Sequence, residues 1–256
     1  LGTGGVAKTG GQLWIPYDEY DLTNASLTVP KEISIKGPLG FRGEAEDVGK
    51  GAVFLTGATD PTFILKNASD VEGLSFECYQ STGTHILIRD VALGDDQAGT
   101  IGISNCAFQG GDKQVVLRGF GGVAIKDNAF VEFNGKAVVL GHSSISGYGF
   151  TDIQLIGNLI SASPSGTTTG THGVDIEGTN NFVSGFVAKR NWIQLFKQAS
   201  SVGLNITGPG FAITVEENIF DTMAVAGSIA VNVGASTAVS VKKNSRQSII
   251  IGLLKR

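Results

Sequence analysis

The stretch AKRNWI (188–193) is one copy of a phrase that recurs along the chain. The phrase has an apolar first residue, an asparagine in the fourth position, and an isoleucine or phenylalanine in the sixth. Its other copies are VEGLSF (71–76), ISNCAF (103–108), IKDNAF (125–130), LIGNLI (155–160), VEENIF (215–220) and VKKNS (241–245). Asparagine fills five of the seven fourth positions, which are 22 to 33 residues apart. Self-similarity at this period indicates a repeat architecture.

A second phrase alternates with the first. It reads AVVLGH (137–142), GVDIEG (173–178), GLNITG (203–208) and AVNVGA (230–235). None of these segments has the apolar spacing of a helix, and each repeat contains about three short strands and three turns. The pattern predicts an all-β fold, a single-stranded parallel β-helix with three short strands per coil. A propeller blade needs roughly 40 residues and a leucine-rich repeat needs leucine at fixed offsets, so both fit less well.

The asparagine position has a physical explanation in such a coil. Successive coils stack about 4.8 Å apart, and asparagine tolerates the left-handed backbone of a sharp corner. Stacked amides also hydrogen-bond to one another along the column. We therefore expect an asparagine column at the corners and a phenylalanine column inside the coil.

The composition excludes several classes of protein. The chain has 256 residues, 37 glycines, 16% charged residues and a net charge of −4. Without a basic stripe we expect no nucleic-acid partner, and without a run of 18 apolar residues we expect no membrane insertion. The two cysteines, Cys78 and Cys106, cannot form a disulfide framework, and we expect them to be reduced and buried.

The segment GGQLWIPYDEYDLTNASLTVPKEISIKGPLG (10–40) resembles the opening of right-handed parallel β-helix proteins of the pectate-lyase-like superfamily. The asparagine corner followed by an aromatic residue also resembles that superfamily. Within it, the glycine-rich, weakly charged chain is most like bacteriophage tailspikes, which are polysaccharide depolymerases. The resemblance implies a right-handed β-helix that works as a homotrimer on bacterial surface polysaccharide, in a virion tail or outside the cell.

The two ends of the repeat lack the caps that a solenoid needs. The opening LGTGGVAKTGG is too rich in glycine to form a capping helix, and the end SIIIGLLKR (248–256) is apolar. We expect residues 1–256 to be a single β-helix domain, part of a longer spike protein. We also expect its ends to be covered by a trimer partner or by further domains.

The copy GVDIEG is the only one with two acids in its variable positions. Since strand side chains alternate, Val174 and Ile176 are predicted inside, and Asp175 and Glu177 outside, roughly 6.5–7 Å apart. Two carboxylates at such a distance match inverting glycoside hydrolysis. We assign Glu177 as the acid and Asp175 as the base, although the roles can be exchanged. Solvated surface acids are the simpler alternative.

Residues near this pair are candidates for binding sugar. They are Asn205, Arg118, His142, His172 and Tyr148. The segment 161–173, with His172 at its end, is predicted to be either a lid or a plain surface bulge. Trp192 is expected on the far side of the coil, in a structural or subunit contact. Acids in glycine-rich loops are rival candidates, and they are Glu44, Glu46, Asp47, Asp60, Asp95 and Asp96.

Three functions stay open. The first is cleavage of bacterial surface polysaccharide by carboxylate acid–base hydrolysis, without a cofactor. The second is a non-catalytic spike or adhesin segment that only binds carbohydrate or forms a rigid shaft. The third is a polysaccharide lyase, which would hold calcium. Two acids are few for a calcium site, and the histidines have no metal-ligand spacing, so we expect no metal.

Overall fold

The computed structural model describes residues 10–30, 32–38, 51–57, 62–66, 69–78, 83–90, 101–118, 122–141, 149–162, 170–176, 182–194, 196, 199–206, 210–223, 227–233 and 236–249. In these residues every helix or strand is a β-strand, and all strand pairs are parallel. The strands form three sheets, named A, B and C here. Among the described residues no helix is long and apolar enough to span a membrane.

Sheet A carries the strands that precede the asparagine corners. Its strands are β1 (Gly11–Trp14), β4 (Ile33–Lys36), β7 (Asp70–Glu72), β10 (Ile101–Ser104), β13 (Val123–Lys126), β16 (Gly149–Thr151), β17 (Ile153–Ile156), β20 (Phe182–Ser184), β21 (Val187–Lys189), β24 (Gly210–Glu216) and β27 (Ser236–Lys242).

Sheet B carries the strands that follow those corners. Its strands are β2 (Asp18–Leu22), β5 (Ala52–Thr56), β8 (Leu74–Cys78), β11 (Ala107–Gly110), β14 (Ala129–Val131), β18 (Leu159–Ser161), β22 (Trp192–Gln194), β25 (Ile219–Met223) and β28 (Ser245–Ile249).

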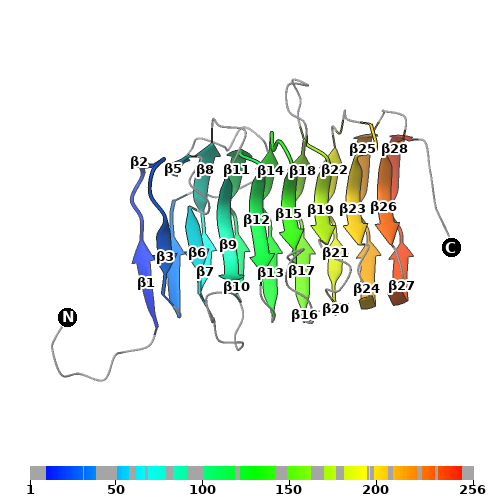
Figure 1. Cartoon of the computed structure of the whole chain (residues 1–256), viewed down its shortest axis with the longest axis horizontal. Coiled ribbons are helices and arrows are strands. Elements are labelled where there is room, and N and C mark those ends of the chain that lie inside the picture. Colours follow the sequence, from blue (N-terminus) through cyan, green and yellow to red (C-terminus); the bar gives the residue numbers. More distant parts are fainter. Residues whose placement is uncertain are drawn as a thin grey trace.

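Sheet C completes each coil. Its strands are β3 (Leu27–Val29), β6 (Phe63–Leu65), β9 (Thr84–Asp90), β12 (Lys113–Arg118), β15 (Lys136–Leu140), β19 (His172–Ile176), β23 (Val202–Ile206) and β26 (Ile229–Val233). Figure 1 shows the coils stacked along the long axis, with β1 at one end and β27 at the other. The predicted parallel β-helix with three strands per coil is confirmed.

The phenylalanine column lies inside the coil, as predicted. Phe76, Phe108 and Phe130 are aligned in register on β8, β11 and β14 and are fully buried. The rings of Phe76 and Phe108 stack with centroids 5.0 Å apart, and those of Phe108 and Phe130 with centroids 4.9 Å apart. Burial of such rings is the main stabilising term of this core.

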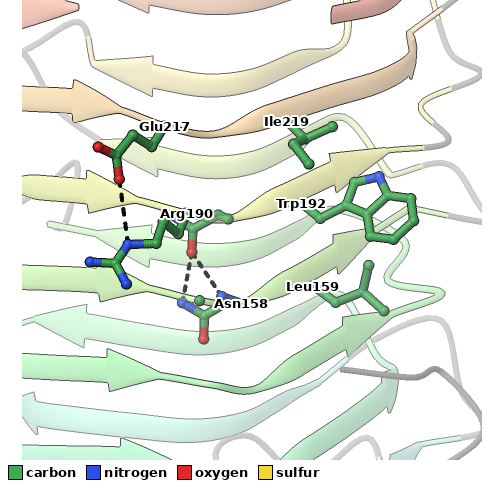
Figure 2. Close-up of a pocket in the computed structure, with 8 residues that line it drawn as sticks. Asn158, Leu159, Arg190, Trp192, Glu217 and Ile219 are labelled. Carbon is green, nitrogen blue, oxygen red and sulfur yellow. Dashed lines mark hydrogen bonds and ion pairs between the residues drawn. The ribbon is translucent and has the colours of Figure 1, made fainter. Parts of the chain in front are cut away.

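The corner between sheets A and B differs from the prediction in one respect. The residue with left-handed backbone is the one before the fourth position of the phrase, which is asparagine in five of the seven coils, and its φ lies between 52° and 69°. These residues are Gly73, Asn105, Asp127, Gly157, Arg190, Glu217 and Lys243. Figure 2 shows one of them, Arg190, with its side chain extending away from the corner. The assignment of left-handed geometry to the asparagine itself is therefore wrong.

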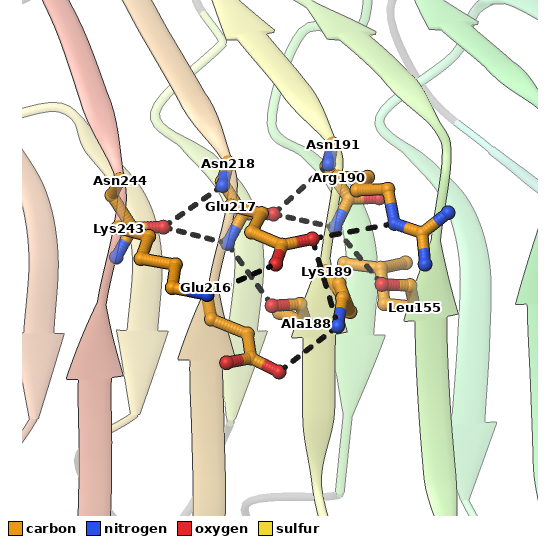
Figure 3. Close-up of polar contacts among 10 residues, drawn as sticks. All are labelled: Leu155, Ala188, Lys189, Arg190, Asn191, Glu216, Glu217, Asn218, Lys243 and Asn244. Carbon is orange, nitrogen blue, oxygen red and sulfur yellow. Dashed lines mark hydrogen bonds and ion pairs between the residues drawn. The ribbon is translucent and has the colours of Figure 1, made fainter.

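The asparagines form the predicted hydrogen-bonded ladder inside the corner (Figure 3). Asn191 Nδ2 donates to Asn218 Oδ1 at 2.9 Å and to the carbonyl oxygen of Leu155 at 2.9 Å. The backbone N–H of Asn191 donates to the same Asn218 oxygen at 3.0 Å. The ladder runs in this way from Asn128 to Asn244. Each asparagine amide therefore forms hydrogen bonds with backbone groups that have no partner in the sheets at the corner.

At its first position the ladder holds a cysteine. The backbone N–H of Cys106 donates to Asn128 Oδ1 at 2.9 Å, and its thiol lies 3.2 Å from the carbonyl oxygen of Ser104. Burial raises the pKa of this thiol to about 12. Cys106 and Cys78 are both buried, as expected, and neither forms a disulfide.

The apolar columns reach both ends of the stack without cover from described residues. Leu13, in register with buried Ile35, is 50% exposed, and Val241, in register with buried Val215, is 49% exposed. Exposed core positions at the edge of a solenoid favour association. The expectation that a partner or a further domain covers these ends stays a prediction.

Candidate functional site

Five residues of neighbouring strands form a column on the outer face of sheet C. Register pairing aligns Val116, Val139, Asp175, Asn205 and Asn232 on five successive strands. The residues on either side of Asp175 belong to the core, because Val174 and Ile176 are 0% and 1% exposed. Asp175 therefore faces outward from the coil.

Asp175 is buried although it faces outward, which differs from the solvated surface acid that the sequence offered as the simpler alternative. Asp175 is only 5% exposed, while Val116 and Val139 are 1% and 0% exposed and form a small apolar cluster of their own. Strand alternation fixes the face to which a side chain points, but it does not tell whether water reaches that face.

Both carboxylate oxygens of Asp175 have a partner. Lys136 Nζ donates to Oδ2 at 2.5 Å, and Asn205 Nδ2 donates to Oδ1 at 2.6 Å. The amide of Asn232 continues the series, donating to Asn205 Oδ1 at 2.8 Å. Four coils are thus joined by side chains across the outside of sheet C. A buried carboxylate needs such partners, because an unpaired charge is costly to bury.

Lys136 is not among the residues that the sequence predicted for this site. Its Cα is in register with His172 on the next strand, three positions before Asp175. If side chains alternated strictly along β19, His172 would point into the core as Val174 does. Instead two consecutive residues, Gly173 and Val174, face the core, since a Cβ on Gly173 would touch Ile160 and Phe196. Lys136 reaches Asp175 because the following pair, 137 and 138, lies in the core in the same way.

His172 lies beside this cluster at the start of β19. It is half-buried, and its Nδ1 is 2.9 Å from the hydroxyl of the neighbouring Thr171. The backbone of His172 is in register with that of Lys136 on the neighbouring strand, and its role in binding sugar stays a prediction.

The other predicted site residues are not brought together by the described part of the chain. Arg118 ends β12, where its backbone is in register with Asp90 after a shift in the ladder. Glu177, His142 and Tyr148 lie outside the described residues, as do all six rival acids. The proposed Asp175–Glu177 pair stays a prediction.

The available groups define what this site can do. It offers one aspartate with an opposing ammonium, a series of amides, and an imidazole at its edge. Amides and carboxylates are hydrogen-bonding partners for hydroxyl-rich ligands. Among the described residues no group of three or more His, Cys, Asp or Glu side chains is placed to hold a metal ion.

Comparisons with known proteins identify the fold. No protein-family model and no curated protein matches the sequence. The structure is similar to that of DFA-IIIase from Arthrobacter chlorophenolicus A6 in complex with GF2. The TM-score is 0.50 at 12% identity, over 98% of this chain and 78% of that chain.

Two further structures are more distant. One is the catalytic unit of a thermostable GH87 alpha-1,3-glucanase from Streptomyces thermodiastaticus strain HF3-3, with a TM-score of 0.39 at 11% identity, over 93% of this chain and 60% of that chain. The other is tailspike protein gp49 from Acinetobacter baumannii bacteriophage Fri1, a capsular polysaccharide depolymerase, with a TM-score of 0.36 at 8% identity, over 96% of this chain and 59% of that chain. At 12% identity the similarity to DFA-IIIase supports the fold alone, a right-handed parallel β-helix.

Proposed function

We propose that this protein binds a bacterial surface polysaccharide on the outer face of sheet C and hydrolyses it with Asp175 and Glu177. The observation that carries the proposal is the fixed carboxylate of Asp175, held by Lys136 and Asn205 within a column of polar side chains. Strands stack at about 4.8 Å, so this column offers hydrogen-bonding groups at regular intervals along an extended chain.

In this mechanism Asp175 is the base and Glu177 the acid. Lys136 and Asn205 fix the carboxylate of Asp175 so that it keeps one orientation while it activates a water molecule. The i, i+2 spacing of the two acids predicts a separation at the lower end of the inverting range of about 6.5–9.5 Å. Hydrolysis then gives a product of inverted anomeric configuration.

A non-catalytic binding role is the second candidate. It is favoured by the burial of Asp175 and by the occupation of both its oxygens. In that case the Lys136–Asp175–Asn205 cluster holds neighbouring coils together, and the protein binds carbohydrate without cutting it.

Incubation with a panel of capsular and O-antigen polysaccharides separates these roles. New reducing ends without ultraviolet absorbance of an unsaturated sugar indicate a hydrolase, and such absorbance indicates a lyase. Binding without new ends indicates the non-catalytic role. If no polysaccharide is bound or cut, the proposal is wrong.

Variants then locate the reaction. Asp175→Asn and Glu177→Gln are each expected to abolish cleavage and to keep binding. Glu216→Gln is the matched control, because Glu216 also pairs with a lysine, Lys189, but on sheet A. Full activity of both site variants would place the chemistry elsewhere.

The proposed setting of this activity is a homotrimeric spike, in a virion tail or outside the cell. The uncovered apolar residues at both ends of the stack support association. A mass from light scattering tests it, and a monomer at all concentrations would contradict the trimer.

A further inference from the structure

A cavity of about 350 Å³ lies at the corner between sheets A and B, on a different face from Asp175. We call it the corner notch. Its lining includes Gly157, Leu159, Arg190, Trp192, Glu217 and Ile219, several of which are labelled in Figure 2. Its volume falls within the range of about 300–1,000 Å³ that small-molecule pockets occupy.

The notch has a cause in the sequence. The left-handed corner position carries Asp127, Arg190 and Glu217 in neighbouring coils, but glycine at 157. A Cβ on Gly157 would lie only 2.3 Å from Asp127 Oδ1. Gly157 therefore contributes no side chain to the wall of the notch, and the carboxylate of Asp127 lies close to where its Cβ would be.

One side of the notch is an exposed indole. Trp192 is in register with Leu159 and Ile219 on the outer face of sheet B. Trp192 is 45% exposed and Ile219 40%, whereas Leu159 is 6% exposed. Figure 2 shows the indole between these two aliphatic side chains. An indole in this position offers a flat apolar face together with an N–H donor.

The opposite side is polar. Arg190 Nε lies 3.5 Å from Glu217 Oε2, and Lys189 Nζ is 3.5 Å from the same oxygen. The side chain of Arg190 is 66% exposed and that of Glu217 34%. Figure 3 shows Glu217 between the cations of adjacent coils. A guanidinium donates up to five hydrogen bonds and a carboxylate accepts several, so this side matches a ring with many hydroxyl groups.

We propose that the corner notch binds one sugar residue of a polysaccharide, with the apolar face of the sugar on Trp192. Arg190 donates to its ring or hydroxyl oxygens, and Glu217 accepts from its hydroxyl groups. The choice of a polysaccharide rests on the proposed function, but the notch is a separate site on another face. Its role is to hold the chain, which increases affinity for a long polymer through a second contact.

Tryptophan fluorescence tests the proposal directly. The chain has two tryptophans, so Trp14→Phe leaves Trp192 as the sole reporter. Short oligosaccharides prepared from each polysaccharide of the panel are titrated into this variant, also with Asp175→Asn added to prevent cleavage. A saturable change in Trp192 emission is expected with at least one of them.

Three substitutions identify the notch as the source of the signal. Trp192→Ala, measured by calorimetry, is expected to weaken oligosaccharide binding about tenfold, equivalent to about 1.4 kcal/mol. Arg190→Gln removes the guanidinium from the polar side of the notch and keeps a long side chain at this corner; it is expected to weaken the binding seen in Trp192 emission about tenfold. Trp14→Ala is the control, because Trp14 is 56% exposed but far along the stack on β1, and it is expected to bind normally.

Failure of the notch proposal can be distinguished from failure of the proposed hydrolase function. Cleavage without any change in Trp192 emission overturns the notch and leaves the hydrolase intact. An emission change without cleavage supports the notch and contradicts the hydrolase. If no oligosaccharide changes the emission and Trp192→Ala lowers the oligomeric mass in light scattering, the indole is a subunit contact and the notch proposal is wrong.

Discussion

Lys136 Nζ lies 2.5 Å from Asp175 Oδ2, although 39 residues separate the two along the chain. One coil brings them together, and the contact joins β15 to β19 on the outside of sheet C. The side chain of Lys136 is 22% exposed and that of Asp175 7%. The two partners are therefore not equivalent, because the side chain of Lys136 is about three times as exposed as that of Asp175.

This asymmetry predicts unequal effects of removing each partner. Lys136→Met leaves a buried carboxylate without its cation and is expected to cost about 2–3 kcal/mol of unfolding free energy. Asp175→Asn removes the buried charge, and the lysine can turn to water, so about 1 kcal/mol is expected. Urea unfolding measures both, and the double variant is expected to cost less than the sum. Equal costs for the single variants would contradict the burial argument.

The asparagine ladder predicts a position-dependent cost. Asn191→Ala deprives the backbone and side-chain N–H groups of Asn158 and the carbonyl of Leu155 of their partner. At about 1–3 kcal/mol for each orphaned buried group, a loss of about 3 kcal/mol or more is expected in chemical unfolding. Asn24→Ala is the control, because Asn24 is exposed and its amide donates to the hydroxyl of the neighbouring Thr23 at 3.4 Å; a change of about 0.5 kcal/mol or less is expected. A similar cost at both positions would show that burial does not set the strength of the ladder.

The stacked phenylalanines predict a large cavity effect. Phe108 contacts rings above and below it at centroid distances of 5.0 and 4.9 Å. Phe108→Ala is expected to destabilise the protein by about 3–5 kcal/mol, measured as the shift of the unfolding midpoint. Phe211→Ala removes the same atoms from a side chain that is 51% exposed, so the expected change is about 0.5 kcal/mol or less. Equal destabilisation of the two variants would show that the phenylalanine column does not stabilise the core.

A buried histidine predicts acid sensitivity. Burial lowers the pKa of His85 to about 4, partly opposed by its contact with the Gly110 carbonyl. That carbonyl only accepts, so Nε2 carries the hydrogen, and Nδ1 lies 2.9 Å from the Thr56 hydroxyl. Because the unfolded histidine binds a proton below about pH 6.5 and the folded one only near 4, stability falls as pH falls through this window. The loss is on the order of 3 kcal/mol.

Denaturant unfolding from pH 7 to pH 4 checks this with His85→Gln as the reference. The glutamine variant cannot bind the proton, so it is expected to lose less stability across this window than the natural chain. Parallel curves for the two proteins would show that another group causes the acid sensitivity.

The fold could be predicted because the same short phrase recurs in the sequence. The phrase around Asn128, Asn158 and Asn191 returns once per coil, so residues with the same role stack in register and the asparagine ladder follows. The left-handed residue before each asparagine was missed because it is never the same type twice in succession. Asp127, Gly157 and Arg190 show this variety. The backbone turn is set there by the ladder hydrogen bonds and the coil, and no residue type marks it.

The sequence by itself determined the winding of the chain and the outward direction of Asp175, because strand alternation and coil repetition are local properties. Only the tertiary structure decided that Lys136 meets Asp175, because two consecutive residues face the core near the start of both β15 and β19 and break the strict alternation of a strand. The tertiary structure also decided that Asp175 is buried and that Trp192, beside the corner notch, is exposed. Access of water depends on what packs over each face of the coil, and a strand pattern does not contain that information.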